Sequence, residues 1–520
     1  MARRVLQISP ATWAGGIALA LVLALSFGSL AAVALRAEGD TGLGPADWAA
    51  IRFTLVQALL SAAISVALAV PVGRALARRR FAGRQVLITL LGAPFILPVI
   101  VAVLGLIAVF GRGGILSQAL GLMGFEPISI YGFHGVVLAH VFFNLPLATR
   151  LILQGWLDIP SERFRLAASL GFGTRDVARV LERPMLRQVL PGAFLVIFLL
   201  CLTSFAVALT LGGGPRATTV ELAIYQSFRF DFDLGRAALL ALVQFALGAA
   251  AALVALRVAL PTGIGAGLDR PMTRWDAASG WLRVQDAALI ALATLFLVVP
   301  LAMIAINGAA ALPSLPASVG WAALRSLAVA LGSAALTLLL ALSIAALVVR
   351  RGSKLAEAIG TLTIAASPLV IGTGLFVILF PLIRPERVAL EVTVLVNAAM
   401  SLPFALRALV PALTAVEADF GRLADELGLT GTSRLRRLWL PRLRRPLGFS
   451  AGLAAALSMG DLGVIAVFAS PDGGTLPLQI YRLMAAYRMG DAAGAALLLL
   501  ALSLALFWVF DRGGRLDADA

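Results

Sequence analysis

Long apolar runs almost without charge recur along the whole chain, and they constrain its fold more than any other feature. Hydrophobic residues make up 60% of the chain and charged residues 13%, against roughly 25% charged residues in globular domains. About 20 apolar residues in a helix span the hydrocarbon of a bilayer, and most runs reach this length. They are 8–35, 53–73, 85–110, 133–149, 188–215, 237–256, 287–323, 326–349, 358–383, 392–406, 446–470 and 492–510.

We interpret these runs as about twelve transmembrane helices, about six before residue 260 and about six after residue 285. The predicted fold is therefore an all-α polytopic membrane protein. Because an even number of helices returns each half to the side on which it began, the halves form two parallel repeats of about six helices. The first run is longer than the 7–15 residues of a signal-peptide core, so we expect an uncleaved first helix.

The formal net charge of +15 follows this predicted topology. With the N-terminus in the cytoplasm, the basic clusters Arg78–Arg80 and Arg350–Arg351 lie on the cytoplasmic side, as the positive-inside rule requires. The even number of helices then places the C-terminus in the cytoplasm as well. We expect membrane lipid as the partner of this basic chain, and no nucleic acid.

A short pattern occurs twice without a gap, at an offset of 257 residues (171 to 428). Its positions are Arg165, Leu166, Ala167, Gly171 and Pro184 in the first copy, and Arg422, Leu423, Ala424, Gly428 and Pro441 in the second. A gapless repeat at about half the chain length predicts two structurally equivalent halves.

The repeat divides the chain into three parts. The first repeat covers 1–260, with its loop at about 157–190, and the second covers 286–520, with its loop at about 414–446. Between them, 261–285 is rich in Gly, Pro and charge, which is typical of a linker. The topology places this linker and both loops in the cytoplasm.

Each loop has the pattern of a short helix that ends at a glycine. Leu166, Ala167 and Leu170 recur at helical spacing, which predicts one apolar face. Gly171 allows the positive φ that commonly ends a helix, and Pro184 predicts a bend before the next transmembrane helix. With several arginines after the glycine, each loop is predicted to form an apolar and basic elbow suited to docking in a groove.

The chain lacks the motifs of an enzyme or a metal site. Its single lysine, Lys354, does not stand in a P-loop, and the two histidines, His134 and His140, are too few for zinc. We expect both histidines and the single cysteine, Cys201, to serve packing. We predict no catalytic residue, no metal ligand and no cofactor in the chain itself, so transport would be driven by a separate ATPase or an ion gradient.

Polar groups inside apolar runs are the other functional candidates. Asp461 is the one carboxylate well inside a run. It could offset a cationic substrate in a transport pathway, pair with a neighbouring arginine, or cap a broken helix. Asn144 and Asn397 could line the same pathway or form interhelical hydrogen bonds.

The repeated loop resembles the "EAA" loop of ABC importer permeases, Glu-Ala-Ala-x3-Gly-x9-Ile-x-Leu-Pro. The glycine and proline positions match, whereas Arg165 and Arg422 stand at the position of the family's glutamate. Three longer stretches, 95–105, 138–146 and 211–226, together with the length, resemble the fused permeases of bacterial thiamine ABC importers.

This resemblance implies a type I ABC importer permease fold in the bacterial inner membrane. It implies transport of thiamine and its phosphate esters from the periplasm to the cytoplasm, with a periplasmic thiamine-binding protein at the outer face. A homodimeric ABC ATPase, which binds ATP and Mg, would dock on the two elbows. The positions Arg165, Leu166, Ala167, Gly171, Pro184 and their five counterparts would transmit the coupling.

Three other interpretations remain open at this point. A fused permease for ferric iron shares the doubled loop and a similar length. An ion-coupled secondary transporter explains the topology, but it would need several paired membrane carboxylates, and only Asp461 offers itself. A scaffolding membrane protein would have no ATPase partner.

Overall fold

The computed structural model describes residues 10–37, 42–91, 96–214, 217–257, 274–362, 367–470 and 473–515, and these residues form helices and connecting turns with no strand. Of the predicted linker 261–285, residues 261–273 lie outside the described residues, as do both chain ends. The helices of the first half are α1 (Pro10–Leu23), α2 (Ser29–Arg36), α3 (Pro45–Arg78), α4 (Arg84–Leu90), α5 (Val99–Phe110), α6 (Ile115–Leu122), α7 (Phe133–Leu157), α8 (Ser161–Ser169), α9 (Thr174–Val177), α10 (Arg183–Leu202), α11 (Phe205–Leu211), α12 (Val220–Gln226) and α13 (Leu234–Arg257).

The second half begins with a helix that starts inside the segment 261–285. Its helices are α14 (Gly280–Ala311), α15 (Ala317–Arg351), α16 (Lys354–Leu362), α17 (Pro368–Leu379), α18 (Ala389–Glu426), α19 (Gly431–Arg434), α20 (Leu440–Arg442), α21 (Arg444–Met459), α22 (Gly463–Phe468), α23 (Leu476–Ala485) and α24 (Met489–Arg515).

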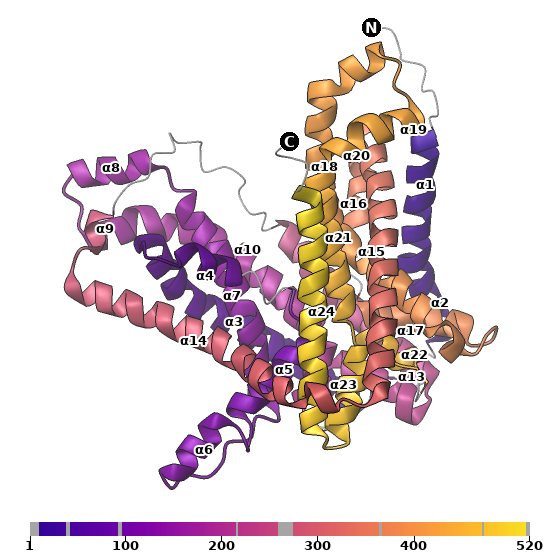
Figure 1. Cartoon of the computed structure of the whole chain (residues 1–520), viewed down its shortest axis with the longest axis horizontal. Helices are drawn as coiled ribbons and strands as arrows, with labels where there is room; N and C mark the ends of the chain where they lie inside the picture. The colour runs from indigo at the N-terminus through magenta and orange to yellow at the C-terminus, as the bar shows by residue number, and fades with distance from the viewer. Residues whose placement is uncertain are drawn as a thin grey trace.

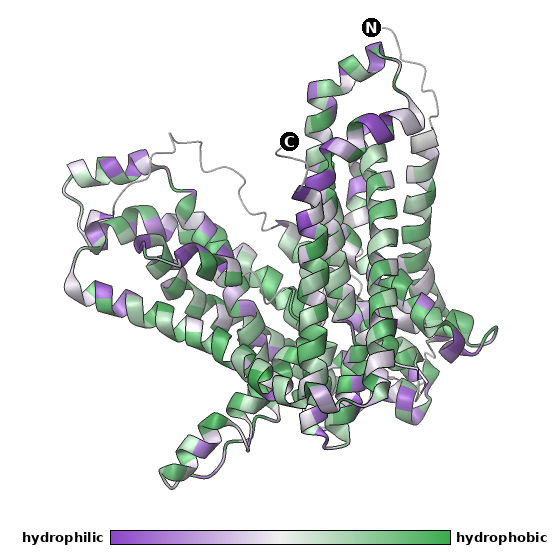
Figure 2. Cartoon of the chain, viewed as in Figure 1, coloured by the Kyte–Doolittle hydropathy of each residue, from purple (hydrophilic) through white to green (hydrophobic). Residues whose placement is uncertain are grey.

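Eleven helical segments among the described residues are long and apolar enough to cross a membrane. The apolar helix α17 is shorter, at 12 residues. It comes after α15 in the second half, and this is the place that α5 has after α3 in the first half. The prediction of an all-α polytopic membrane protein is thereby confirmed. Figure 2 shows hydrophobic residues along the long helices and hydrophilic ones gathered at the ends that carry α8, α9, α19 and α20.

Five of the apolar runs are not single helices, and in this respect the sequence analysis was wrong. The run 85–110 holds two helices, α4 and α5, and the run 358–383 likewise includes parts of α16 and α17. The run 188–215 is broken between α10 and α11. The run 446–470 is likewise broken between α21 and α22, and the run 287–323 is divided at 311–317. Pro313 and Pro316 divide the last of these, because proline cannot donate the backbone hydrogen bond of a helix interior. Hydropathy alone did not register these breaks, since apolar residues continue through them.

The helices form two arms that meet at one end and diverge toward the other, where α8 and α19 lie (Figure 1). Each arm contains the first helix of the opposite half. In the arm built mainly from the second half, α1 packs against α15 and α2 packs against α17. In the arm built mainly from the first half, α14 packs against α3 and α5.

Two glycines at equivalent positions allow this exchange of helices. A Cβ atom on Gly105 of α5 would collide with the backbone of Pro300 in α14, and one on Gly374 of α17 would collide with the backbone of Ser29 in α2. Without side chains, these positions let the backbones of paired helices approach closely, as small residues do in membrane helix packing. The largest buried apolar cluster draws on helices of both halves, so the two arms share one core where they meet.

Candidate functional site

Both predicted elbows end a helix at a glycine with positive φ, as the sequence indicated. The φ angle is 69° at Gly171 and 64° at Gly428. In the first elbow the backbone N–H of Phe172 donates to the carbonyl of Ala167 at 3.0 Å. In the second elbow the N–H of Leu429 donates to the carbonyl of Ala424 at 2.8 Å. This six-to-one hydrogen bond around a left-handed residue is the Schellman motif, which ends the helix and turns the chain sharply.

The elbow helices present leucines outward and bury alanine. Leu166 and Leu170 are each 61% exposed, and Leu423 and Leu427 are 53% and 66% exposed. By contrast, Ala167 and Ala424 are buried. The single apolar face expected from the sequence is therefore split, because the small residue packs on the bundle while the leucine pair, four residues apart, faces away from it. Arg165 and Arg422 are exposed next to these leucines.

The two elbows differ in how they join their bundles. In the first half α7 ends at Leu157, and Pro160 separates it from α8. In the second half α18 continues without a break to Glu426, because the position equivalent to Pro160 holds Glu417, which is compatible with a helix interior. The second elbow is thus the end of a 38-residue helix, and the prediction of a separate short helix was wrong there.

A π-helical turn follows each glycine, at 178–182 and at 435–439. Pro184 lies in the first turn of α10, and Pro441 lies in the short α20. Proline is tolerated in the first turn of a helix, where its missing N–H has no intrahelical partner. The bend predicted at Pro184 is therefore a local π-helical distortion before the proline.

A buried carboxylate, which the sequence analysis did not single out, holds the first elbow. The carboxylate of Glu182 forms two ion pairs. Its Oε2 lies 2.7 Å from Arg74 Nη2, and its Oε1 lies 3.0 Å from Arg274 Nη2. Arg274 also stacks over the ring of Phe164 in α8, with 4.5 Å from Cζ to the ring centroid. Because Arg274 belongs to the segment that joins the two halves, this segment is tied to the base of the first elbow.

Two more hydrogen bonds hold the segment 274–277 against the first elbow. The indole N–H of Trp275 donates to the carbonyl of Phe172 at 3.1 Å, and the hydroxyl of Thr174 donates to the carbonyl of Asp276 at 2.6 Å. Burial by itself would raise the pKa of Asp276, but the hydrogen bonds and charge of Arg274 lower it below its usual value. The segment 274–277 therefore keeps an ionised, paired carboxylate against the elbow.

The second elbow uses a different carboxylate. Glu417 Oε1 accepts Arg434 Nε at 2.9 Å and the indole N–H of Trp439 at 2.6 Å. Arg434 Nη1 also bonds Asp425 Oδ1 at 2.6 Å. Burial disfavours the charged form of Arg434, but the hydrogen bonds with both carboxylates raise its pKa above the usual value. At the 257-residue offset Trp439 corresponds to Glu182, so the two elbows achieve a similar turn with non-equivalent charges.

If the elbows couple transport to an ATPase, as the resemblance implies, replacing both elbow glycines with valine is expected to abolish most ATP-driven uptake while leaving the amount of protein in the membrane unchanged. Both sites have open space for a Cβ, so the effect would come from the backbone, where a left-handed L-residue costs roughly 1–2 kcal/mol. The double variant Gly171→Val/Gly428→Val would be compared with Gly320→Val, which has equally open space and an ordinary φ. Uptake at the wild-type rate by the double variant would argue against a coupling role of the elbows.

Polar side chains gather at the two broken helices in the middle of the bundles. In the first half His140 Nε2 lies 2.7 Å from the hydroxyl of Ser204, at the break between α10 and α11. In the second half Asn397 Nδ2 donates to the hydroxyl of Ser458 at 3.0 Å, near the break between α21 and α22. His140 and Asn397 are 257 residues apart, so they are equivalent; the same offset applied to the sequence would have identified this pair.

Asp461 lies at the break after α21. Its Oδ1 accepts the backbone N–H of Gly463 at 3.2 Å, which satisfies a free donor at the start of α22. Among the described residues Oδ2 is buried without a hydrogen-bond partner. Of the alternatives left open above, the cap of a broken helix agrees with these contacts, and one carboxylate oxygen remains available.

Asn144 is placed differently from Asn397. Its amide donates to the carbonyl of His140 at 2.8 Å and contacts the sulfur of Cys201 at 3.3 Å. The first contact lies within α7, and the second joins α7 to α10 of the same bundle. Asn144 is therefore brought together with His140 and Cys201, but not with Asp461.

Comparison with known proteins agrees with the predicted class. No protein-family model matches the chain. The thiamine transport system permease protein ThiP of Brucella abortus (strain 2308) is 40% identical over 536 residues, which cover 100% of this chain and 98% of the relative. The proteins of the same description from Escherichia coli (strain K12) and Haemophilus influenzae are 38% identical over 89% of each chain and 33% identical over 96% of each chain, respectively.

These relatives align along nearly the whole chain, so the similarity covers both elbows and both sets of helices. A permease is a membrane transport subunit and not an enzyme, in agreement with the multi-pass helical fold. The chain belongs to the family of thiamine transport system permease proteins.

Proposed function

We propose that the chain is the membrane subunit of an ATP-driven importer that carries thiamine and its phosphate esters from the periplasm into the cytoplasm. The observation that carries this proposal is the pair of equivalent elbows at one end of the molecule, each with two exposed leucines beside a Schellman turn. Relatives described as thiamine permeases over the full length support the substrate.

Two equivalent docking elements suit a partner with two-fold symmetry. We assign this partner as a homodimeric ABC ATPase, which would bind ATP and Mg, so that the permease needs no cofactor of its own. The arms diverge toward the elbows (Figure 1), and closure of the ATPase dimer would draw the elbows together. The face with the elbows would then be cytoplasmic, with both termini on that side of the inner membrane, and a periplasmic thiamine-binding protein would dock at the opposite face.

Within the membrane we assign Asp461 and Asn397 to the substrate pathway. The partnerless Oδ2 of Asp461 could offset the permanent positive charge of the thiazolium ring, since a buried charge is stabilised chiefly by an opposite one. For Asn144 the contacts support a structural role within the first bundle.

The test is uptake of radiolabelled thiamine into vesicles that contain the chain, its ATPase and its binding protein. ATP-dependent accumulation that excess unlabelled thiamine competes away is expected. Co-purification with the ATPase without thiamine uptake would preserve the importer class and redirect the search to ferric iron. Uptake driven by an ion gradient without ATP would contradict the whole proposal.

A further inference from the structure

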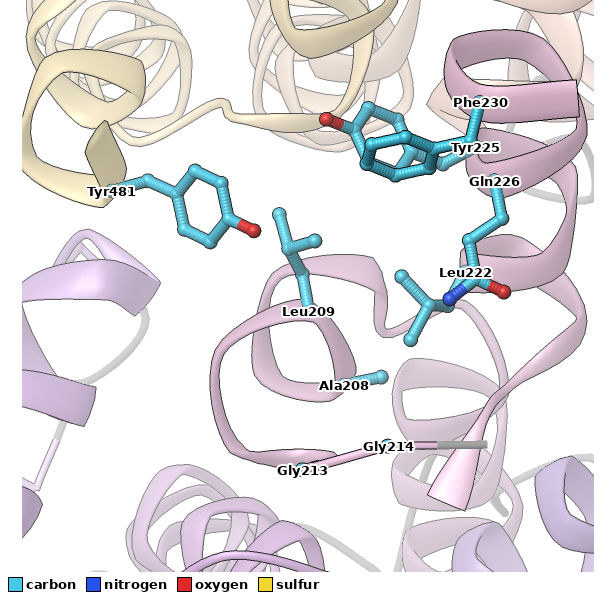
Figure 3. A pocket seen from close by; sticks show the side chains of 9 residues that line it. All are labelled: Ala208, Leu209, Gly213, Gly214, Leu222, Tyr225, Gln226, Phe230 and Tyr481. Atoms are coloured by element: carbon cyan, nitrogen blue, oxygen red, sulfur yellow. The ribbon is translucent and has the colours of Figure 1, made fainter. Parts of the chain in front are cut away.

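A small cavity lies between the two halves at the end of the molecule opposite the elbows, where α23 lies (Figure 1). Its volume is about 160 Å³. Tyr225, Gln226 and Phe230 line it from the first half, and Tyr481 lines it from the second. Figure 3 shows the rings of Tyr225 and Phe230 on one side and Tyr481 across from them, with Leu209 and Leu222 between. The wall of the cavity therefore consists of aromatic faces, aliphatic side chains and one amide.

The two tyrosines occupy equivalent places in the repeat. Each belongs to a short helix whose first N–H is bound by a hydroxyl of the neighbouring long helix. The hydroxyl of Thr54 in α3 accepts a hydrogen bond from the N–H of Val220 at 2.9 Å. The hydroxyl of Ser326 in α15 accepts one from the N–H of Leu476 at 2.7 Å. Because both short helices are fixed in the same way, Tyr225 and Tyr481 face the boundary between the halves as a matched pair.

Aromatic packing fixes the ring of Tyr225 further. Its centroid lies 5.4 Å from that of Phe205 and 6.1 Å from that of Phe230, in edge-to-face arrangements. Tyr225 is buried, whereas Phe230 is largely exposed. The cavity thus has a rigid inner wall and an accessible rim, as expected of a preformed site for a flat ligand.

The charges around the cavity disfavour a cation. No carboxylate is among the described residues that line it. Burial raises the pKa of the Tyr225 hydroxyl, and the nearby positive charges of Arg229 and Arg482 act in the opposite direction. With no carboxylate in its wall and aromatic and aliphatic side chains around it, the cavity suits a neutral aromatic ring better than a ring with a permanent positive charge.

The amide of Gln226 adds hydrogen-bonding specificity. It lines the cavity, and Gln226 is half-buried, so its amide can meet a ligand there. An amide offers one donor and one acceptor side by side, which complement an aminopyrimidine edge in the way that glutamine pairs with adenine. The volume of about 160 Å³ is smaller than the roughly 300–1,000 Å³ of pockets for whole drug-sized ligands, so the cavity suits one ring of a two-ring molecule.

We propose that this cavity holds the neutral aminopyrimidine ring of thiamine, stacked against Tyr225 and Tyr481 and hydrogen-bonded to Gln226. The inference rests on the proposed function and adds an orientation, with the thiazolium ring directed out of this carboxylate-free cavity. Since the two tyrosines belong to opposite halves, movement of the halves would open or close this subsite.

The test uses the full complex of permease, ATPase and binding protein in proteoliposomes. Aromatic stacking on a nucleobase-like ring typically contributes enough for a change of about tenfold in affinity. We therefore expect Tyr481→Ala to raise the half-saturating thiamine concentration about tenfold and Gln226→Leu to raise it severalfold. Tyr481→Phe, which keeps the ring, should recover most of the loss seen with alanine. Tyr487→Ala serves as the matched control, because Tyr487 is exposed and does not line the cavity.

Competition by the separate halves of thiamine tests the orientation. The aminopyrimidine half should inhibit uptake by the wild-type complex more strongly than uptake by Gln226→Leu, whereas inhibition by the thiazole half should be equal in both. Because the same binding protein serves both complexes, any difference arises in the permease. Unchanged half-saturation in Tyr481→Ala and Gln226→Leu, with normal wild-type uptake, would overturn this inference and leave the proposed function intact. A wild-type complex that accumulates no thiamine would overturn both.

Discussion

The double substitution Leu166→Glu/Leu423→Glu is expected to release the ATPase from the permease and to abolish ATP-driven uptake. Both leucines are more than half exposed on the elbow helices, so the change should not disturb packing within the permease. If the ATPase covers them, each lost leucine removes roughly 1.5–3 kcal/mol of apolar burial. For two elbows this amounts to a loss of at least about 100-fold in affinity, because every 1.4 kcal/mol corresponds to about tenfold.

Titration of the purified ATPase onto the detergent-solubilised permease would measure this loss. The matched control is Leu122→Glu, which introduces the same charge at an exposed leucine of α6, outside the elbows. A second variant, Leu166→Met/Leu423→Met, keeps an apolar side chain of similar size and should retain binding. If the glutamate variant binds the ATPase as tightly as the wild type, the exposed leucine pairs are not the docking surface.

Removing the buried carboxylate of the first elbow is expected to destabilise it by up to about 3–5 kcal/mol, because Arg74 loses its carboxylate partner and Arg274 keeps only Asp276. The variant is Glu182→Ala. Glu182 is 2% exposed and is paired with both Arg74 and Arg274. The expected result is a fall in the thermal unfolding midpoint of the permease together with weaker ATPase binding.

The surface variant Glu126→Ala should shift the midpoint very little, since exposed substitutions typically change stability by no more than about 0.5 kcal/mol. The double variant Glu182→Leu/Arg74→Leu should recover part of the loss, because replacing an ion pair with apolar side chains is often neutral and Arg274 keeps Asp276 as its partner. An unfolding midpoint equal to that of the wild type in Glu182→Ala would show that the ion pairs do not hold the elbow.

Local properties of the chain were open to prediction from sequence. The length of an apolar run depends only on consecutive residues, which is why the all-α polytopic fold was evident. The positive φ at Gly171 and Gly428 was also predictable, because glycine is the residue that adopts this conformation without steric cost. The repeat offset placed both elbows at corresponding positions of their halves.

Other features depend on which helices meet, and only the tertiary structure decided them. The exchange of α1 and α14 between the arms leaves no periodicity in the sequence. Helical spacing grouped Leu166 with Ala167, yet packing against the bundle buried the alanine and exposed the leucine.

The ion pairs of the elbows show most clearly which contacts could not be predicted from the sequence. Glu182 meets Arg274 across 92 residues of sequence, and Glu417 meets Arg434 across 17; nothing in the repeat relates the two pairs. The aromatic cavity likewise requires Tyr481 of the second half to lie across from Tyr225 of the first half. The sequence alone determined the membrane-spanning class of the fold and the glycine turns, because these follow from burial in lipid and from backbone sterics. The tertiary structure decided the partners of the buried charges and the walls of the cavity, because electrostatic and packing energies depend on distances between segments that are remote in the chain.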